Sequence, residues 1–315
     1  MASFRADTSD SGIGFSLSPH PQQTMEPHGL MSGLPGDYLL VHFHRFHQVK
    51  AAAKQVFDSL AENQDGNQFI VVLGLSETAR QRLDSGEDCL NGISFRFMWE
   101  ENAGLIKIIP TGEHENVTDA IRFEIGRICL FMGISRDEMA FGMSTTNKPT
   151  VGNKGKQPDQ CFWSPSRYPG PGQQAGWPTL VIETGVSESL RRLREDVHWW
   201  FHNSLGQVRI VLVISVCRRQ RTVIIEKWQL APSGTPNPLT RNMLNQLANI
   251  RPPLVQQPVS SQQPYPVQEI QIDPVSVQGA PLTLNFEAVF DRARQLNETD
   301  IVLNANDLRY CTRFI

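Results

Sequence analysis

Two acidic residues in the middle of the chain stand where short apolar runs begin or end. Asp159 opens the run 159–163, and Glu183 follows the β-branched, apolar run 179–182. The run 179–182 is typical of a strand that is buried on both faces, and the run 159–163 is also compatible with a strand. The stretch 164–172 between them is rich in turn-forming residues and would fold the two strands into a hairpin. Because carboxylates on adjacent strands can share a divalent cation through hard oxygen ligands, the pair is a candidate metal site.

The same two positions have a simpler interpretation. An acidic residue at a strand end, beside a turn, is commonly a turn or cap residue with no chemical role. The residue types alone leave both interpretations of Asp159 and Glu183 open.

A third candidate acid lies on a predicted helix. Counted at about 100° per residue, one arc of this helix is apolar, and it contains Val117, Ala120, Ile121, Ile125 and Ile128. Glu124 falls near the middle of that arc, where an unpaired carboxylate would be costly to bury. It either points into the cleft as a third acidic group, or it reaches solvent or pairs with Arg127. His114, at the start of the helix and the edge of the arc, is a weaker candidate.

Composition limits the class of protein. The chain has 315 residues, of which 40% are hydrophobic, and a formal net charge of -3. This charge argues against strong unspecific binding of nucleic acid by the whole chain, although a local basic groove remains compatible with it. The five cysteines form no C-x-x-C pair, so neither a zinc ribbon nor a disulfide framework is indicated. We expect an intracellular protein, because no apolar stretch approaches the roughly 18 residues of a membrane span and the N-terminus lacks a signal peptide.

Patterning along the chain predicts an α/β (α+β) fold with a mixed central sheet flanked by helices. Strands are expected over 68–74, 93–99, 105–109, 208–216 and 222–228. The predicted organisation is a disordered leader, N-terminal elements packed on the core, the core itself, a Pro/Gln-rich linker or insert, and C-terminal strands with a helix. In the same order, these segments are 1–36, 37–92, 93–230, 231–266 and 267–315.

From the Glu124 helix onward, the expected order is helix, strand with Asp159, strand with Glu183, helix, strand, strand. This order resembles the PD-(D/E)XK nuclease-like superfamily, with its restriction-endonuclease-like fold. It is most similar to uncharacterised fungal members and, more distantly, to bacterial restriction endonucleases known only by sequence. The residues that carry the resemblance are Lys156-Gln157-Pro158-Asp159, Pro178 to Gly185, Ser187-Glu188-Ser189-Leu190, and Leu193 to Trp200.

The resemblance implies a site and an activity. Asp159 and Glu183 would be the metal-binding acids, and the backbone carbonyl of Thr184 would complete the coordination of Mg²⁺ or Mn²⁺. The activity implied is a phosphodiesterase that cleaves DNA or RNA with a metal-activated water. Nucleic acid would then be the partner, and no membrane is implied.

One position departs from the family pattern. The motif has lysine two residues after the second acid, on the same strand face, and this chain has Gly185 there. Lys156, three residues before Asp159, is the candidate to supply the missing ammonium, and Arg194 is a weaker one. The alternatives are therefore an active metal-dependent nuclease, a catalytically inactive interaction module, and a structural or effector-type domain with vestigial acids.

Overall fold

The computed structural model describes residues 29–63, 66–86, 89–109, 112–168, 175–186, 190–313 and 315. Residues 1–28 of the predicted leader (1–36) lie outside these ranges. The turn residues 169–172 and the stretch Ser187-Glu188-Ser189, which contributes to the family resemblance, also lie outside them. The last part of the leader is described, and it packs on the protein instead of being disordered. Leu30 is buried in a core that it shares with strands of both sheets.

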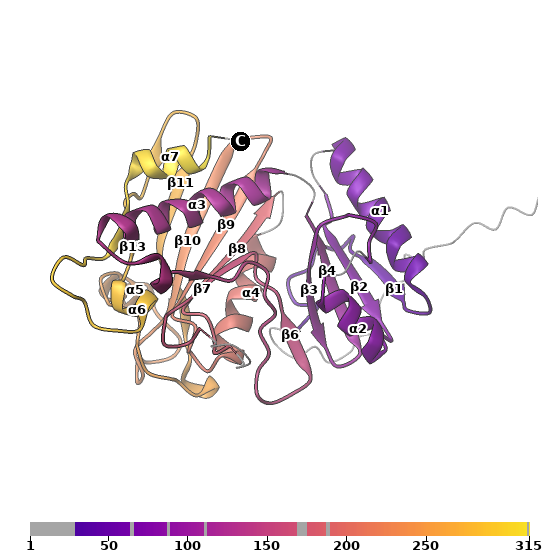
Figure 1. The fold of residues 1–315 in the computed structure, drawn as a ribbon, viewed down its shortest axis with the longest axis horizontal. Coiled ribbons are helices and arrows are strands. Elements are labelled where there is room, and N and C mark those ends of the chain that lie inside the picture. The colour runs from indigo at the N-terminus through magenta and orange to yellow at the C-terminus, as the bar shows by residue number, and fades with distance from the viewer. Residues whose placement is uncertain are drawn as a thin grey trace, which may run out of the picture.

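The larger of two main sheets is mixed. Its strand order is β12-β11-β10-β9-β8-β7-β5, and only β8 and β9 run parallel, while the other neighbouring pairs are antiparallel. Figure 1 shows helix α3 (Gly112–Phe131) crossing in front of this sheet. The expected mixed sheet flanked by helices is confirmed. The strands are β5 (Ala140–Phe141), β7 (Gln160–Trp163), β8 (Leu180–Val186), β9 (Ile210–Cys217), β10 (Thr222–Leu230), β11 (Pro264–Ile272) and β12 (Val277–Gln278).

Alternation along β8 explains why the sheet is apolar on both faces. Ile182 packs in one core with Ile121 of α3, whereas its neighbour Val181 packs in another core with Val197 of α4 (Leu190–Asn203). Successive strand side chains point to opposite faces, so a strand covered by helices on both sides needs a continuous apolar run. The acid at Glu183 interrupts that run on the α4 face.

The smaller sheet has the order β1-β2-β4-β3-β6 and carries helices α1 (Phe46–Asn63) and α2 (Glu77–Asp84). The hairpin of β3 and β4 therefore pairs with the N-terminal strands, and not with the strands that carry Asp159 and Glu183. This differs from the core boundary expected at residue 93. The strands are β1 (Leu39–His42), β2 (Phe69–Leu73), β3 (Phe95–Glu100), β4 (Ala103–Ile108) and β6 (Lys154–Lys156).

The remaining elements complete the larger lobe. Segment 231–266 folds back as an insert, because its residues Leu247 and Tyr265 are buried and Arg209 donates hydrogen bonds to the carbonyls of residues 253–255. The C-terminal elements share a core with α3. The C-terminal elements are β13 (Leu282–Leu284), α6 (Phe286–Phe290), β14 (Ile301–Leu303) and α7 (Ala305–Cys311), and the other short helices of this lobe are η1 (Arg136–Glu138), α5 (Arg241–Leu247) and η2 (Val259–Ser261).

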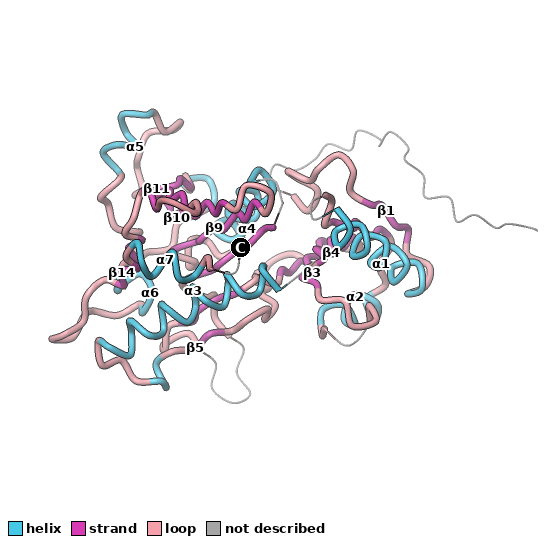
Figure 2. The backbone as a smooth tube through the Cα atoms, turned by 90° about the horizontal axis from the view of Figure 1, so that it is seen from above, coloured by secondary structure: helices cyan, strands magenta, loops and turns pink. Residues whose placement is uncertain are grey.

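The two lobes lie side by side, as Figure 2 shows, and they meet through an apolar core. Phe69, Met98 and Leu105 of the smaller sheet pack in one cluster with Val181 and Trp199 of the larger lobe. This contact buries the ends of β7 and β8 against the smaller sheet. Within the described ranges, no helix is long and apolar enough to cross a membrane.

Candidate functional site

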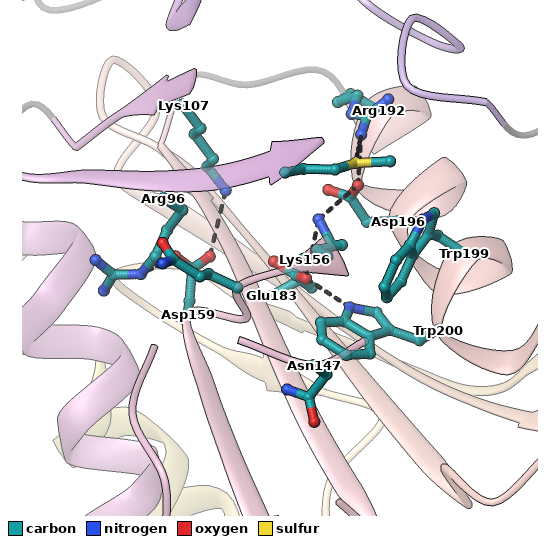
Figure 3. Close-up of polar contacts among 12 residues, drawn as sticks. Arg96, Lys107, Asn147, Lys156, Asp159, Glu183, Arg192, Asp196, Trp199 and Trp200 are labelled. Carbon is teal, nitrogen blue, oxygen red and sulfur yellow. Dashed lines mark hydrogen bonds and ion pairs between the residues drawn. The ribbon is translucent and has the colours of Figure 1, made fainter. Parts of the chain in front are cut away.

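A buried group of charged side chains lies where the two lobes meet, and Figure 3 shows how they converge. We call it the charge cluster. Its carboxylates come from the larger lobe, while most of its cations come from strands β3, β4 and β6 of the smaller sheet. Its members are Arg96, Lys107, His114, Lys156, Asp159, Glu183, Arg192 and Asp196.

Asp159 is held at the edge of β8 by backbone and side-chain donors. Strand β7 begins at Gln160, so the backbone N–H of Thr184 has no β7 partner, and it donates instead to Asp159 Oδ2 over 2.8 Å. Lys107 Nζ lies 3.3 Å from the same oxygen, and Arg96 Nε lies 3.2 Å from Oδ1. His114 Nε2 is also 3.2 Å from Oδ1. The buried carboxylate therefore has cationic or polar neighbours on both of its oxygens.

The carbonyl oxygen of Thr184 is the second atom on which donors converge. Lys107 Nζ donates to it over 2.7 Å, and His114 Nε2 lies 2.8 Å away. A carbonyl only accepts hydrogen bonds, so the network assigns a proton to His114 Nε2. One ammonium, that of Lys107, thus contacts both Asp159 Oδ2 and the Thr184 carbonyl.

Glu183 occupies a second part of the charge cluster, on the α4 face. Trp200 Nε1 donates to Glu183 Oε1 over 2.6 Å, and Lys156 Nζ lies 3.3 Å from that oxygen. Lys156 Nζ is also 2.8 Å from Asp196 Oδ1, which accepts a 2.7 Å hydrogen bond from Arg192. Pairing of Lys156 with Met98 across β6 and β3 fixes the position of the lysine.

The electrostatic surroundings shift the pKa values of Asp159 and Glu183 in opposite directions. Burial raises the pKa of Asp159, but His114, Lys107 and Arg96 outweigh burial and hold this pKa well below its usual value. Burial raises the pKa of Glu183 to about 7, because the attraction of Lys156 does not offset burial together with repulsion by Asp196 and Asp159. Two carboxyls close enough to influence each other therefore differ in their tendency to ionise.

The donor atoms fit a small hard cation, with one condition. Asp159 Oδ2 and the Thr184 carbonyl converge on a single point, and oxygen ligands of this kind suit Mg²⁺ or Mn²⁺. That point is taken by the ammonium of Lys107, so a cation and this ammonium exclude each other. The adjoining cavity measures about 20 Å³, roughly the room for one water molecule.

Protein side chains alone would not complete such a coordination shell. In the described part of the chain, no three His, Cys, Asp or Glu side chains are grouped so that they could hold a metal ion. A cation here would therefore depend on the Thr184 carbonyl and on water or substrate oxygens, as Mg²⁺ commonly does.

Most residues expected from the sequence meet in the charge cluster. The structure brings together Asp159, Glu183, the Thr184 carbonyl and Lys156. The expectation that Glu124 is a third acid aimed at the cleft is wrong. Its carboxylate accepts a 2.6 Å hydrogen bond from Arg127, the partner named in the alternative, and Arg127 also bonds Asp307 of α7.

Sequence reasoning does not find four further members of the charge cluster, and it gives His114 only as a weaker candidate. Arg96 and Lys107 face each other across β3 and β4, so their side chains share one face of the smaller sheet. The isolated lysine in the apolar run 105–109 was a usable signal, because a lysine inside a buried strand requires a partner. Asp196 and Arg192 lie four residues apart on α4, the spacing of helical neighbours.

No protein-family model matches the sequence, and no curated protein matches it. A comparison with solved structures matches the chain to a "putative nuclease belonging to DUF820" from Anabaena variabilis. The match covers 52% of this chain and 88% of that chain, with 11% sequence identity and a TM-score of 0.32. A likeness at this level does not assign the chain to that family.

Proposed function

We propose that this chain is a metal-dependent phosphodiesterase that acts on nucleic acid. The observation that carries the proposal is the convergence of Asp159 Oδ2 and the Thr184 carbonyl on one point, beside Glu183 and Lys156. The sequence resemblance implies a divalent ion at these oxygens, and this implication supports the proposal. A bound Mg²⁺ or Mn²⁺ would polarise a phosphate and lower the pKa of a coordinated water.

The residues of the chain would supply the remaining requirements. Lys107 Nζ bonds the carbonyl of the residue just before Gly185, so it stands beside the position where the family motif has its lysine. On displacement from Asp159, this ammonium would offset negative charge on a phosphate in the transition state. Lys156, held between Glu183 and Asp196, would be the second ammonium at the site.

The charge balance of the cluster suits an anionic substrate. Its three carboxylates face four lysine and arginine side chains together with His114. The excess of positive groups favours phosphate binding, and low dielectric surroundings strengthen each contact.

A comparison of the cleavage rates of Lys107→Met and Lys156→Met decides which of the two lysines acts in catalysis.

The test is cleavage of fluorescently labelled single- and double-stranded DNA and RNA, with Mg²⁺, Mn²⁺ or EDTA. The wild type should cleave at least one substrate only when metal is present. Asp159→Asn should lose at least a hundredfold in rate, because it removes a metal ligand. Asp58→Asn, on an exposed salt bridge of α1, is the matched control and should cleave normally. A thermal unfolding transition for each variant confirms that the variant is folded under the conditions of the assay.

A second candidate is a non-catalytic module that keeps the fold. One observation favours it: every carboxylate of the charge cluster is already within ion-pair distance of a cation. In that case Asp159 would serve only to join the lobes. Absence of metal-dependent cleavage of all four substrates, with no difference in Mn²⁺ uptake between wild type and Asp159→Asn, would select this candidate.

A further inference from the structure

A polar pocket of about 370 Å³ lies beside the charge cluster, between the end of α2 and strand β3. Its volume is within the range of small-molecule sites, about 300–1,000 Å³. The pocket is lined by three serines, two glycines, polar and charged side chains and several apolar ones, and it is far larger than the 20 Å³ cavity inside the cluster. A substrate phosphate cannot enter the small cavity without rearrangement, whereas the pocket has room for a nucleotide unit.

Two side chains separate the pocket from the cavity. Arg96 and Gln157 line both hollows. Gln157 is fixed by hydrogen bonds from its amide nitrogen to the Asp84 carbonyl, and from the backbone N–H of Phe97 to its Oε1. Arg96 is therefore the charged group that connects the two spaces.

The nitrogens of the Arg96 guanidinium point in two directions. Its Nε faces Asp159 at 3.2 Å, while Nη1 donates to the carbonyl of Phe95. Figure 3 shows the terminal nitrogens directed away from the acids. The side chain is 18% exposed, against 0% for Asp159, so its outer end reaches the pocket. A guanidinium keeps its charge and presents several donors to a phosphate.

The one carboxylate in the described pocket wall is already neutralised. Asp84 Oδ2 lies 3.2 Å from Lys148 Nζ, and Oδ1 accepts a hydrogen bond from Thr146. Ser94 and Ser144 line the same pocket. The wall thus includes one guanidinium and residues with hydroxyl groups, which are the kinds of donor that recognise a phosphate ester.

We propose that this pocket binds the phosphate of a nucleotide unit and that Arg96 is its phosphate ligand. The proposal rests on the proposed phosphodiesterase function and deepens it, because it names the residue that receives the substrate phosphate. Arg96 holds the phosphate on the pocket side of its guanidinium, while its Nε faces Asp159 on the other side. Binding of the nucleotide itself requires neither a metal ion nor cleavage.

The test is isothermal titration calorimetry, in which the metal-free full chain is titrated with deoxyadenosine 5′-monophosphate and, separately, with inorganic phosphate. Ser94→Trp fills the pocket from an exposed position just before β3, and Ser94 itself is not a member of the charge cluster. Ser260→Trp, on the exposed turn η2, is the matched control for the added indole. Arg96→Lys keeps a positive charge beside Asp159 but loses the fork of donors.

The wild type and Ser260→Trp should bind the mononucleotide with equal affinity, and binding should weaken as salt is raised. Ser94→Trp should abolish binding, and Arg96→Lys should weaken it about tenfold. Equal binding by wild type and Ser94→Trp, or no binding by the folded wild type, would overturn the pocket assignment. If the wild type binds the mononucleotide but shows no metal-dependent cleavage, the phosphodiesterase proposal alone would be overturned.

Discussion

The ammonium of Lys107 donates a 2.7 Å hydrogen bond to the carbonyl oxygen of Thr184 and thereby joins the two sheets of the protein. The same nitrogen lies 3.3 Å from Asp159 Oδ2. It therefore stands between the two oxygens that we propose as ligands of a divalent ion. A lysine in this position would make cation binding a competition between two positive groups.

Replacement of Lys107 by methionine should tighten Mn²⁺ binding by roughly tenfold or more. The bound cation would no longer have to displace an ammonium from buried carboxylate and carbonyl oxygens, contacts of the order of 1.5–3 kcal/mol each. Isothermal titration with Mn²⁺ measures the change. Lys227→Met is the matched control, because Lys227 is also buried and also donates to a carbonyl, that of Thr283, over 2.8 Å.

Unchanged or weaker Mn²⁺ binding by folded Lys107→Met would contradict the competition. The variant should remain folded, since Asp159 keeps Arg96 and His114 as neighbours. If Lys227→Met gained the same affinity, the effect would belong to charge removal in general and not to this position.

Arg192 anchors the N-terminal segment to α4. Its Nη1 donates to the carbonyls of Leu30 and Ser32, and its Nη2 donates to Asp196. Arg192→Met should lower the free energy of unfolding by about 3–5 kcal/mol, because it leaves a buried carboxylate with one partner fewer. Urea unfolding measures the loss. Arg191→Met, at the exposed neighbouring position, should change stability by less than about 0.5 kcal/mol.

Sequence reasoning found the strand that carries Glu183 because its apolar run is buried on both faces, and it also placed a strand directly after Asp159. It named Lys156 as the candidate for the missing ammonium because Lys156 lies three residues before Asp159. It did not place Lys107, since the pairing of β3 and β4 with the N-terminal strands depends on long-range packing that no local pattern encodes. The salt bridge of Glu124 shows the same limit, because its partner is local but the direction of the helix face is set by tertiary contacts.

The last part of the leader was also misjudged. Its composition resembles that of a disordered segment, yet Leu30 is buried and its carbonyl bonds Arg192. A few residues can be ordered by one buried guanidinium from elsewhere in the chain. Composition averages over a window and does not detect such a contact.

The raised pKa of Glu183 makes the stability of the protein depend on pH. Burial raises this pKa from 4.5 to about 7, despite the nearby ammonium of Lys156. Between these values the folded chain holds a proton that the unfolded chain has lost. The ionisation of Glu183 therefore lowers the free energy of unfolding as the pH rises from about 4.5 to 7. Asp159 acts in the opposite sense, because its lowered pKa favours the folded state until the pH falls into the acid range.

Glu183→Gln should remove the decline that Glu183 causes. An amide oxygen can still accept the hydrogen bond from Trp200 Nε1, but it does not ionise. Between pH 5 and pH 7, the variant should therefore lose about 1–3 kcal/mol less stability than the wild type. Urea unfolding at pH 5, 6 and 7 measures the difference, with Glu115→Gln on the exposed side of α3 as the control. Parallel pH profiles for wild type and Glu183→Gln would mean that the Glu183 carboxylate is already ionised at pH 5 and that Lys156 outweighs burial.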